Sequence, residues 1–109
     1  MDTAAVPASF APVVGAFATD RSVSRGKMFS SGNVLSVNGK IFAMLVKGKL
    51  VVKLPKQRVD ELVGARVGTY FAPGHGRLMK QWISISPGRA PWVELAKDAY
   101  AFVRRPLAR

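Results

Sequence analysis

The amino-acid sequence predicts an α+β fold with an antiparallel sheet and the element order α-β-β-β-α-β-β-α. Two tight-turn signals predict the sheet, because Asn38-Gly39 and Lys47-Gly48 each separate two strand-like runs by two residues. Asn-Gly favours the type I′ hairpin turn, in which both central residues need a positive φ. The strands come in runs rather than alternating strictly with helices, which argues against a doubly wound nucleotide-binding sheet. A chain of 109 residues has room for one domain.

The sequence begins with an expected arm and a short helix. Residues 1–8 are small and polar and include Pro7, so we expect a flexible N-terminal arm before a single domain of residues 9–109. Residues 19–27 are polar, and we expect them to form a connection. Between these segments, apolar residues have the i, i+3, i+4, i+7 spacing of one helical face: Phe10, Val13, Val14 and Phe17.

Residues 33–54 contain three strand-like runs, and the two turns between them define a register. Counting from the turns places both Val34 and Val52 opposite Ala43. This register puts one set of side chains on a core face: Val34, Ile41, Ala43, Leu45, Leu50, Val52 and Leu54. It puts a second set on the opposite face: Leu35, Val37, Phe42, Met44, Val46 and Val51, with Lys40, Lys49 and Lys53 around them. The second face is more apolar than a solvated sheet face, so we expect a helix, a second subunit or a partner to cover part of it.

The rest of the chain reads as a helix, two strands and a final helix. Residues 55–66 have an apolar helical side, and Gly64 is a suitable end for this helix. Residues 67–72 and 78–86 are expected to be strands. Pro91 suits the first turn of the last helix. The apolar stripe of that helix is Trp92, Leu95, Ala96, Ala99, Phe102 and Val103, and Pro106 ends it.

The segment "RGKMFSSGNVLSVNGKIFAMLVKGKLVVKLP" resembles the start of the N-terminal domain of the TfoX/Sxy competence-regulator family. The likeness rests on Met28-Phe29, on Gly32 and on the "VNGKIFA" hairpin, and it continues in "FAPGHGRLMKQWISI" and the "WVELA" helix. It covers about residues 24–103, and domains of the YjbR type share a similar layout. The resemblance implies the α+β arrangement given above. Longer members add a C-terminal domain similar to a helix-hairpin-helix and take part in transcriptional activation, whereas this sequence covers the first domain alone.

Composition excludes several kinds of site. The absence of cysteine excludes disulfides, thiolate nucleophiles and cysteine-ligated zinc, and a single histidine excludes a histidine cluster, so we expect no metal or cofactor. The longest apolar run, "IFAMLV", is far shorter than the roughly 20 residues that span a membrane. The N-terminus carries Asp2 and lacks the basic region of a signal peptide. We therefore expect a soluble, cytoplasmic protein without membrane association.

The charge favours contact with polyanions. Seventeen basic residues against six acidic residues give a net charge of +11, and such a field attracts nucleic acid, anionic membranes or acidic proteins. The loop "PGHGR" has two readings: a glycine-assisted strand connection, or a phosphate-binding nest helped by Arg77 and Lys80. We expect His75 not to be catalytic, because no carboxylate lies near it in the sequence. Lys49 and Lys53 are further candidates for anion contact.

The second sheet face is the candidate interface. Trp82 has two interpretations, since an indole on a sheet face either packs against apolar neighbours or stacks on a base. We expect a non-enzymatic, small interaction module that uses this face to form a homodimer or to bind a protein partner. The alternative is a sequence-nonspecific nucleic-acid or anion-binding protein that uses basic loops. The interface candidates are Phe42, Met44, Val46, Val51 and Trp82.

Overall fold

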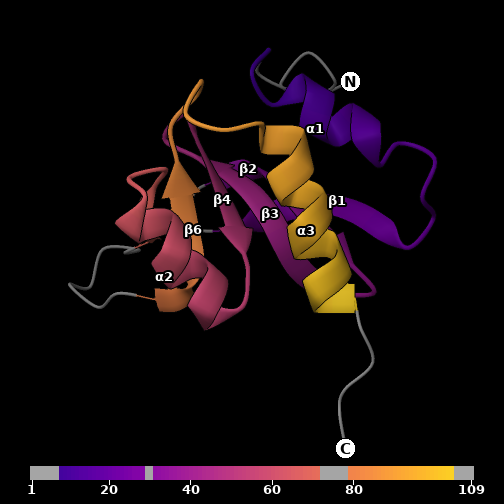
Figure 1. The fold of residues 1–109 in the computed structure, drawn as a ribbon. Helices are drawn as coiled ribbons and strands as arrows, with labels where there is room; N and C mark the ends of the chain where they lie inside the picture. The colour runs from indigo at the N-terminus through magenta and orange to yellow at the C-terminus, as the bar shows by residue number, and fades with distance from the viewer. Residues whose placement is uncertain (1–7, 29–30, 72–78, 105–109) are drawn as a thin grey trace, which may run out of the picture.

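The computed structural model describes residues 8–28, 31–71 and 79–104, and within them it has three helices and one six-stranded open sheet (Figure 1). The strand order is β1-β2-β3-β4-β6-β5, and every neighbouring pair is antiparallel. The α+β class is confirmed, with one more strand than expected. The elements are α1 (Ala11–Ala16), β1 (Val23–Met28), β2 (Ser31–Val37), β3 (Lys40–Val46), β4 (Lys49–Lys53), α2 (Lys56–Gly64), β5 (Thr69–Phe71), β6 (Met79–Ile85) and α3 (Trp92–Arg104).

The additional strand is β1, which lies where the sequence predicted a polar connection over residues 19–27. It is an edge strand and pairs with β2, with Val23 opposite Val37 and Arg25 opposite Leu35. An edge strand needs backbone partners on one side only, and charged residues on it discourage pairing with another chain. Because its residues are mostly polar, β1 lacks the alternation of apolar and polar residues from which a strand is predicted.

The two predicted hairpin turns are confirmed. Asn38 and Gly39 have φ angles of 51° and 84°, and Lys47 and Gly48 have φ angles of 52° and 79°. Both pairs thus have the positive values that a type I′ turn requires. The register between β3 and β4 is also the predicted one, with Ala43 opposite Val52.

The predicted register between β2 and β3 is wrong by one residue beyond a β-bulge. Val34 lies opposite Met44 rather than Ala43, because the pairing shifts between Leu35 and Ser36. Leu35 pairs with Ala43 and Ser36 pairs with Ile41, so Phe42 is the additional residue on β3. A bulge places two consecutive side chains on the same side of a sheet and breaks the period of two.

The bulge exchanges side chains between the two predicted faces. Phe42 was expected on the second face but is fully buried in the main core, as is Val37, and Leu35 is buried there too. Val34 and Ile41, which were expected in the core, belong to the cluster on the opposite side. A period-two reading cannot detect a bulge, because no turn residue marks it.

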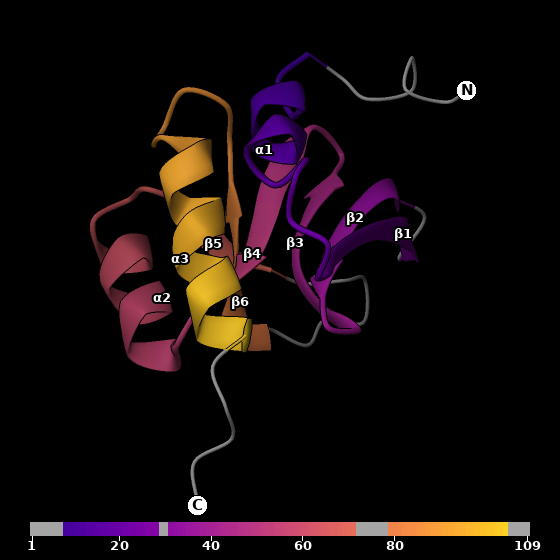
Figure 2. The same ribbon diagram turned by 90° about the vertical axis from the view of Figure 1, so that its right-hand side faces the viewer.

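The main core lies between the helices and the sheet. In Figure 2, α2 and α3 stand on one side, and β1 and β2 curve away on the far side. Helix α3 packs on β2, β3 and β4, α2 packs on β5 and β6, and α1 contacts α3. The sheet supplies most of the buried core side chains: Leu35, Val37, Phe42, Ala43, Leu45, Leu50, Val52, Ile83 and Ile85.

A smaller apolar cluster lies on the side of the sheet away from the helices, which we call the helix-free face. Its buried members are Val34, Met44, Val51 and Phe71, with relative exposures of 6% or less. Ile41, Val46 and Trp82 are partly buried against them. Of the three expected covers for the second apolar face (a helix of the same chain, a second subunit or a partner), the chain itself supplies much of the cover.

Candidate functional site

The strands and the helices differ sharply in charge. Within the described residues, none of the strands contains Asp or Glu, whereas their sequences include Arg25, Lys27, Lys40, Lys49, Lys53 and Lys80. The acidic residues in the described ranges lie in α2, in α3 and in the α1–β1 connection: Asp20, Asp60, Glu61, Glu94 and Asp98. No carboxylate on the described strands offsets these positive charges, and the strands therefore attract anions more strongly.

Several of these acidic residues tie the helix side together. Asp20 accepts hydrogen bonds from the Ser22 hydroxyl (2.6 Å) and backbone N–H (2.9 Å), and from the Tyr100 hydroxyl of α3. These bonds, the Ser22 hydroxyl first, hold the pKa of Asp20 below its usual value. Asp98 forms a 3.4 Å ion pair with Arg58 of α2. These carboxylates therefore have structural partners on the helix side.

Lys53 and Trp82 form a basic–aromatic pair on the helix-free face. They lie opposite each other on β4 and β6, and Nζ of Lys53 is 5.9 Å from the centroid of the indole ring. At this distance the ammonium group is attracted by the ring quadrupole. The pair also lines a cavity of about 460 Å³, which we call the Lys53–Trp82 pocket. This pocket extends beyond the helix-free face to α3, since its other lining residues are Gly39, Lys40, Ile41, Gln81, Phe102 and Val103.

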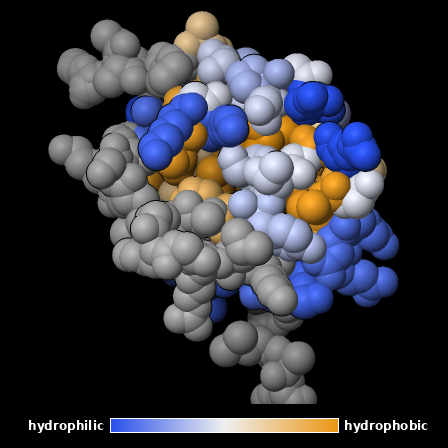
Figure 3. All heavy atoms as spheres, turned by 90° about the vertical axis from the view of Figure 1, so that its left-hand side faces the viewer, coloured by the Kyte–Doolittle hydropathy of each residue, from blue (hydrophilic) through white to orange (hydrophobic). Residues whose placement is uncertain are grey.

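A second cavity of about 300 Å³ opens at the other end of β4, and we call it the basic cleft. Three cationic side chains from separate segments line it: Lys49, Arg66 and Arg89. Its remaining lining is Val63, Val67, Gly68, Thr69, Ser84 and Ser86, so three hydroxyl groups accompany the cations. Figure 3 views the molecule from the side of α2 and β6, and shows strongly hydrophilic residues around a paler area with apolar residues between them.

Tight turns position each cation of the basic cleft. Lys49 follows the type I′ turn. Arg89 closes the turn after β6, where its N–H donates to the Ser86 carbonyl (3.2 Å) and Gly88 has a φ of 83°. This is the pattern of a type II turn. The chain reversals thus set the three cations at one end of the sheet.

Arg66 has the left-handed conformation, with a φ of 64°, at the end of α2. The N–H groups of Arg66 and Val67 donate to the carbonyls of Val63 (3.0 Å) and Leu62 (2.9 Å), which is a Schellman motif. Glycine is the usual residue at this position, because an L-residue is disfavoured there by about 1–2 kcal/mol. The helix ends at Gly64, as the sequence predicted, and the left-handed residue that follows its cap is an arginine.

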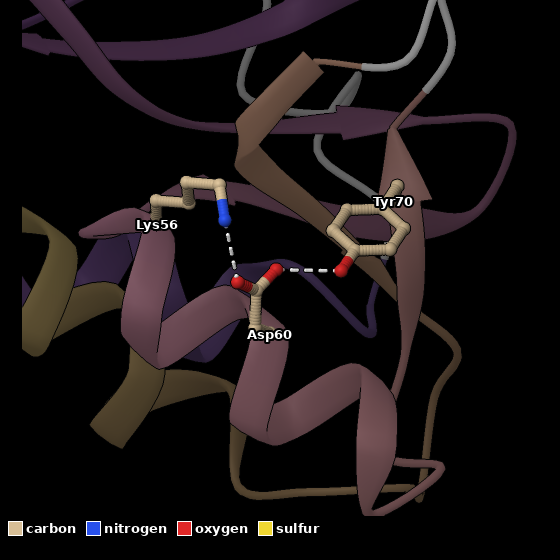
Figure 4. A network of polar contacts seen from close by, with 3 residues as sticks. All are labelled: Lys56, Asp60 and Tyr70. Carbon is tan, nitrogen blue, oxygen red and sulfur yellow. Dashed lines mark hydrogen bonds and ion pairs between the residues drawn. The ribbon is translucent and has the colours of Figure 1, made fainter.

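The orientation of α2 against β5 is held by a network of Lys56, Asp60 and Tyr70 (Figure 4). The Tyr70 hydroxyl donates to Asp60 Oδ1 (2.5 Å), and Lys56 Nζ lies 2.8 Å from Asp60 Oδ2. The hydrogen bond to Asp60 raises the pKa of Tyr70, with burial as a second cause. The same carboxylate raises the pKa of Lys56. The network fixes the two elements whose connection carries Arg66.

Tyr70→Phe should lower stability at neutral pH by an amount that disappears in alkaline solution. The pKa of Tyr70 is raised above its ordinary value of 10.0, so the hydrogen bond stabilises the fold fully below about pH 10. This contribution is lost as the pH rises through the higher folded-state pKa. Urea unfolding between pH 7 and 11 should show a constant difference between wild type and variant up to about pH 10, and a shrinking one above it. A difference that stays constant at alkaline pH would contradict this role.

Of the five residues predicted to contact anions, the structure describes the side chains of two, Lys49 and Lys53. Lys49 and Lys53 alternate with the buried Val51 on β4, so both point to the helix-free face. His75 and Arg77 lie outside the described residues. Lys80 belongs to β6, but its side chain also lies outside the described part.

Three of the five predicted interface residues cannot contact a partner. Phe42, Met44 and Val51 have relative exposures of 0%, 1% and 0%. The bulge turns Phe42 into the main core, and the other two are buried in the smaller cluster. Val46 and Trp82 are only partly buried, so they keep accessible surface.

The sequence reading missed Arg66 and Arg89. Both are basic residues next to chain breaks, Arg66 after Gly64 and Arg89 after Pro87-Gly88, and a basic residue at a turn is a weak signal by itself. Lys49 is separated from each of them by many residues along the chain. Their approach to one cleft follows from the packing of α2 and the β6–α3 turn against the sheet.

The described residues contain neither a metal-binding group nor a membrane-spanning helix. Among residues 8–28, 31–71 and 79–104, there is no group of three or more His, Asp or Glu residues that could hold a metal ion. Within the same ranges, no helix has the length and apolar character needed to cross a membrane.

Comparison with known proteins found no similar protein: the sequence matches no protein-family model and no curated protein, and the fold matches no solved structure. The membership in the TfoX/Sxy family stays a prediction from the sequence.

Proposed function

We propose that the protein is a non-catalytic binding protein that holds single-stranded nucleic acid on its helix-free face without reading the base sequence. The observation that carries this proposal is the basic–aromatic surface of acid-free strands, on which Lys53 lies beside the partly exposed Trp82. Lysine ammonium groups attract phosphates, and an accessible indole offers a platform for an unpaired base. Stacking of this kind contributes about 1–3 kcal/mol per base.

Single strands fit this surface better than duplexes. A base that stacks on a protein side chain has to leave its own stack, which is far easier in a single strand. Lys49 and Lys53 are four residues apart on one strand, and therefore about 13 Å apart along it. A flexible backbone can follow two cations at this spacing with a base on Trp82. The net charge of +11 favours the encounter.

The alternative of docking a protein through apolar contacts is less well supported. Its motive was a surplus of apolar side chains on the helix-free face, and Met44 and Val51 are buried within the chain. The accessible remainder, chiefly Val46 and Trp82, is flanked by lysines. An interface of this composition suits an anion better than an apolar partner.

Binding of a fluorescent oligothymidylate, measured by anisotropy, tests the proposal. Phosphate contacts with the two cations, Lys49 and Lys53, should weaken binding about sevenfold between 50 and 200 mM salt. Lys53→Ala should weaken binding at every salt concentration and reduce the slope of log K against log salt by about 0.7. Lys97→Ala removes the same charge from the exposed side of α3 and should leave the slope unchanged.

Two results would contradict the proposal. One is the absence of binding at 20 mM salt. The other is an equal loss of affinity in Lys53→Ala and Lys97→Ala, because that would mean that net charge alone causes the attraction.

A further inference from the structure

We infer that the basic cleft is a binding site for a phosphate monoester, held by Lys49, Arg66 and Arg89. The inference goes beyond nucleic-acid binding on the helix-free face and does not depend on it. A phosphate group needs several donors that converge on one point. The cleft is the place in the described structure where side chains from the start of β4, the end of α2 and the β6–α3 turn line one cavity.

The cations of the cleft are available to a ligand. Within the described residues, no ion pair or side-chain hydrogen bond engages Lys49, Arg66 or Arg89, and all three are exposed. Among the described residues that line the cleft, none is acidic. By contrast, Arg58 and Lys56 on α2 have carboxylate partners. The three cations that line the cleft thus have no carboxylate partner in the described structure that a ligand would have to displace.

The chemistry of the lining suits phosphate. Arginine donates paired N–H groups in the fork geometry that matches phosphate oxygens, and lysine adds a point charge. The hydroxyls of Thr69, Ser84 and Ser86 can donate to the remaining oxygens. A monoester dianion has three terminal oxygens that can accept hydrogen bonds. Its two negative charges nearly balance the three positive charges of the cleft. A phosphodiester offers one negative charge and two such oxygens, so it would use the site less fully.

The negative end of the α2 dipole opposes anion binding in the cleft, but its charge is smaller than that of the three cations. The C-terminal end of α2 borders the cleft and carries about half a negative elementary charge. The Schellman hydrogen bonds already engage two of its carbonyls. Three positive charges line the same cavity, so the cations outweigh the helix end.

The backbone holds the cleft in place before any ligand arrives. The Arg89 turn is closed by its own hydrogen bond, and the Ser86 carbonyl also accepts one from Trp92 Nε1 (3.4 Å), which anchors the turn to α3. Arg66 has the left-handed conformation in spite of its side chain. Preorganised donors lose less entropy on binding, which favours a small ligand.

Inorganic phosphate, titrated into the ¹⁵N-labelled full-length chain and followed by amide chemical shifts, tests the site. We expect saturable shifts at Arg66, Gly68 and Arg89. Arg66→Gly should weaken phosphate binding about tenfold or more, since a charge-assisted hydrogen bond is lost. It should not lower the melting temperature, because glycine suits this backbone conformation better. Loss of binding in this variant is thus separable from loss of the fold.

Lys47→Gly is the matched control. Lys47 also has a left-handed conformation, with a φ of 52°, and also carries one positive charge, but it does not line the cleft. This variant should bind phosphate within about twofold of wild type. Arg89→Ala should behave like Arg66→Gly. Equal weakening in Lys47→Gly and Arg66→Gly, or shifts that do not saturate, would overturn the inference.

Two further arms identify the source of the phosphate. If a strand end supplies it, a 5′-phosphorylated oligothymidylate should bind more tightly than the 5′-hydroxyl form, and Arg66→Gly should abolish that difference. If a free metabolite supplies it, a small sugar phosphate should bind more tightly than inorganic phosphate, and the 5′-phosphate should make no difference. Lys53→Ala should leave the inorganic phosphate titration unchanged, so a failure of the cleft and a failure of the helix-free face give different results.

Discussion

Phe42→Ala should lower the free energy of unfolding by about 3–5 kcal/mol. Phe42 is fully buried, and its ring forms edge-to-face contacts with Phe17 (5.1 Å between centroids) and Tyr100 (5.5 Å). The side chain thus joins the α1 region, β3 and α3, and alanine would leave a cavity among all three. Such aromatic pairs contribute beyond the area that they bury. Urea unfolding followed by circular dichroism measures the change.

Ile41→Ala is the matched comparison for Phe42→Ala. The two residues are adjacent on β3, and the two losses of stability show which of them lies in the main core. Ile41 is only partly buried on the helix-free face, so we expect a loss of about 1 kcal/mol. An unbroken alternation would give the opposite order, with Ile41 in the core and Phe42 at the surface. A larger loss for Ile41→Ala than for Phe42→Ala would therefore contradict the bulge.

Gly68→Ala should lower the free energy of unfolding by about 1–3 kcal/mol, although it adds a single methyl group. A Cβ at this position would lie 2.5 Å from the Ser84 carbonyl oxygen and 3.0 Å from carbons of Ile83 and Ile85. Backbone cannot move away as a flexible side chain can. β5 has three residues and lies at the sheet edge, so we expect it to shift away from β6. The melting temperature should fall by about 5 °C or more.

Gly15→Ala is the control for this substitution. A Cβ at Gly15 would meet nothing within 4 Å, and the residue lies in α1. Alanine is preferred over glycine in a helix by about 0.5–1 kcal/mol, so this variant should be more stable than wild type. If both variants were destabilised equally, lack of space at Gly68 would not be the cause.

The parts of the fold that the sequence predicted well have local causes. The Asn38-Gly39 and Lys47-Gly48 turns depend on the φ preferences of two adjacent residues. The apolar stripe of α3 depends on a period of 3.6, and its first members Trp92 and Leu95 are buried as expected. These features can be read from a short window because neighbouring residues alone decide them.

The parts that the sequence reading missed have non-local causes. β1 forms because β2 offers it backbone partners, although its own residues are mostly polar. The bulge at Phe42 forms because the pocket between Phe17 and Tyr100 accepts that ring, and both residues are distant in the sequence. Neither feature leaves a periodic signal, since each depends on what packs against the strand from elsewhere in the chain.

The candidate site also has features with local causes and features with non-local causes. The sequence by itself determined the charge excess, the hairpins that present Lys49 and Lys53, and the strands without acidic residues, because composition and turn preference are properties of contiguous residues. Only the tertiary structure decided that Met44 and Val51 are covered and that Arg66 and Arg89 meet Lys49 at one cleft. Burial and convergence depend on how the sheet curves and how α2 packs, and these follow from contacts between residues far apart in the chain.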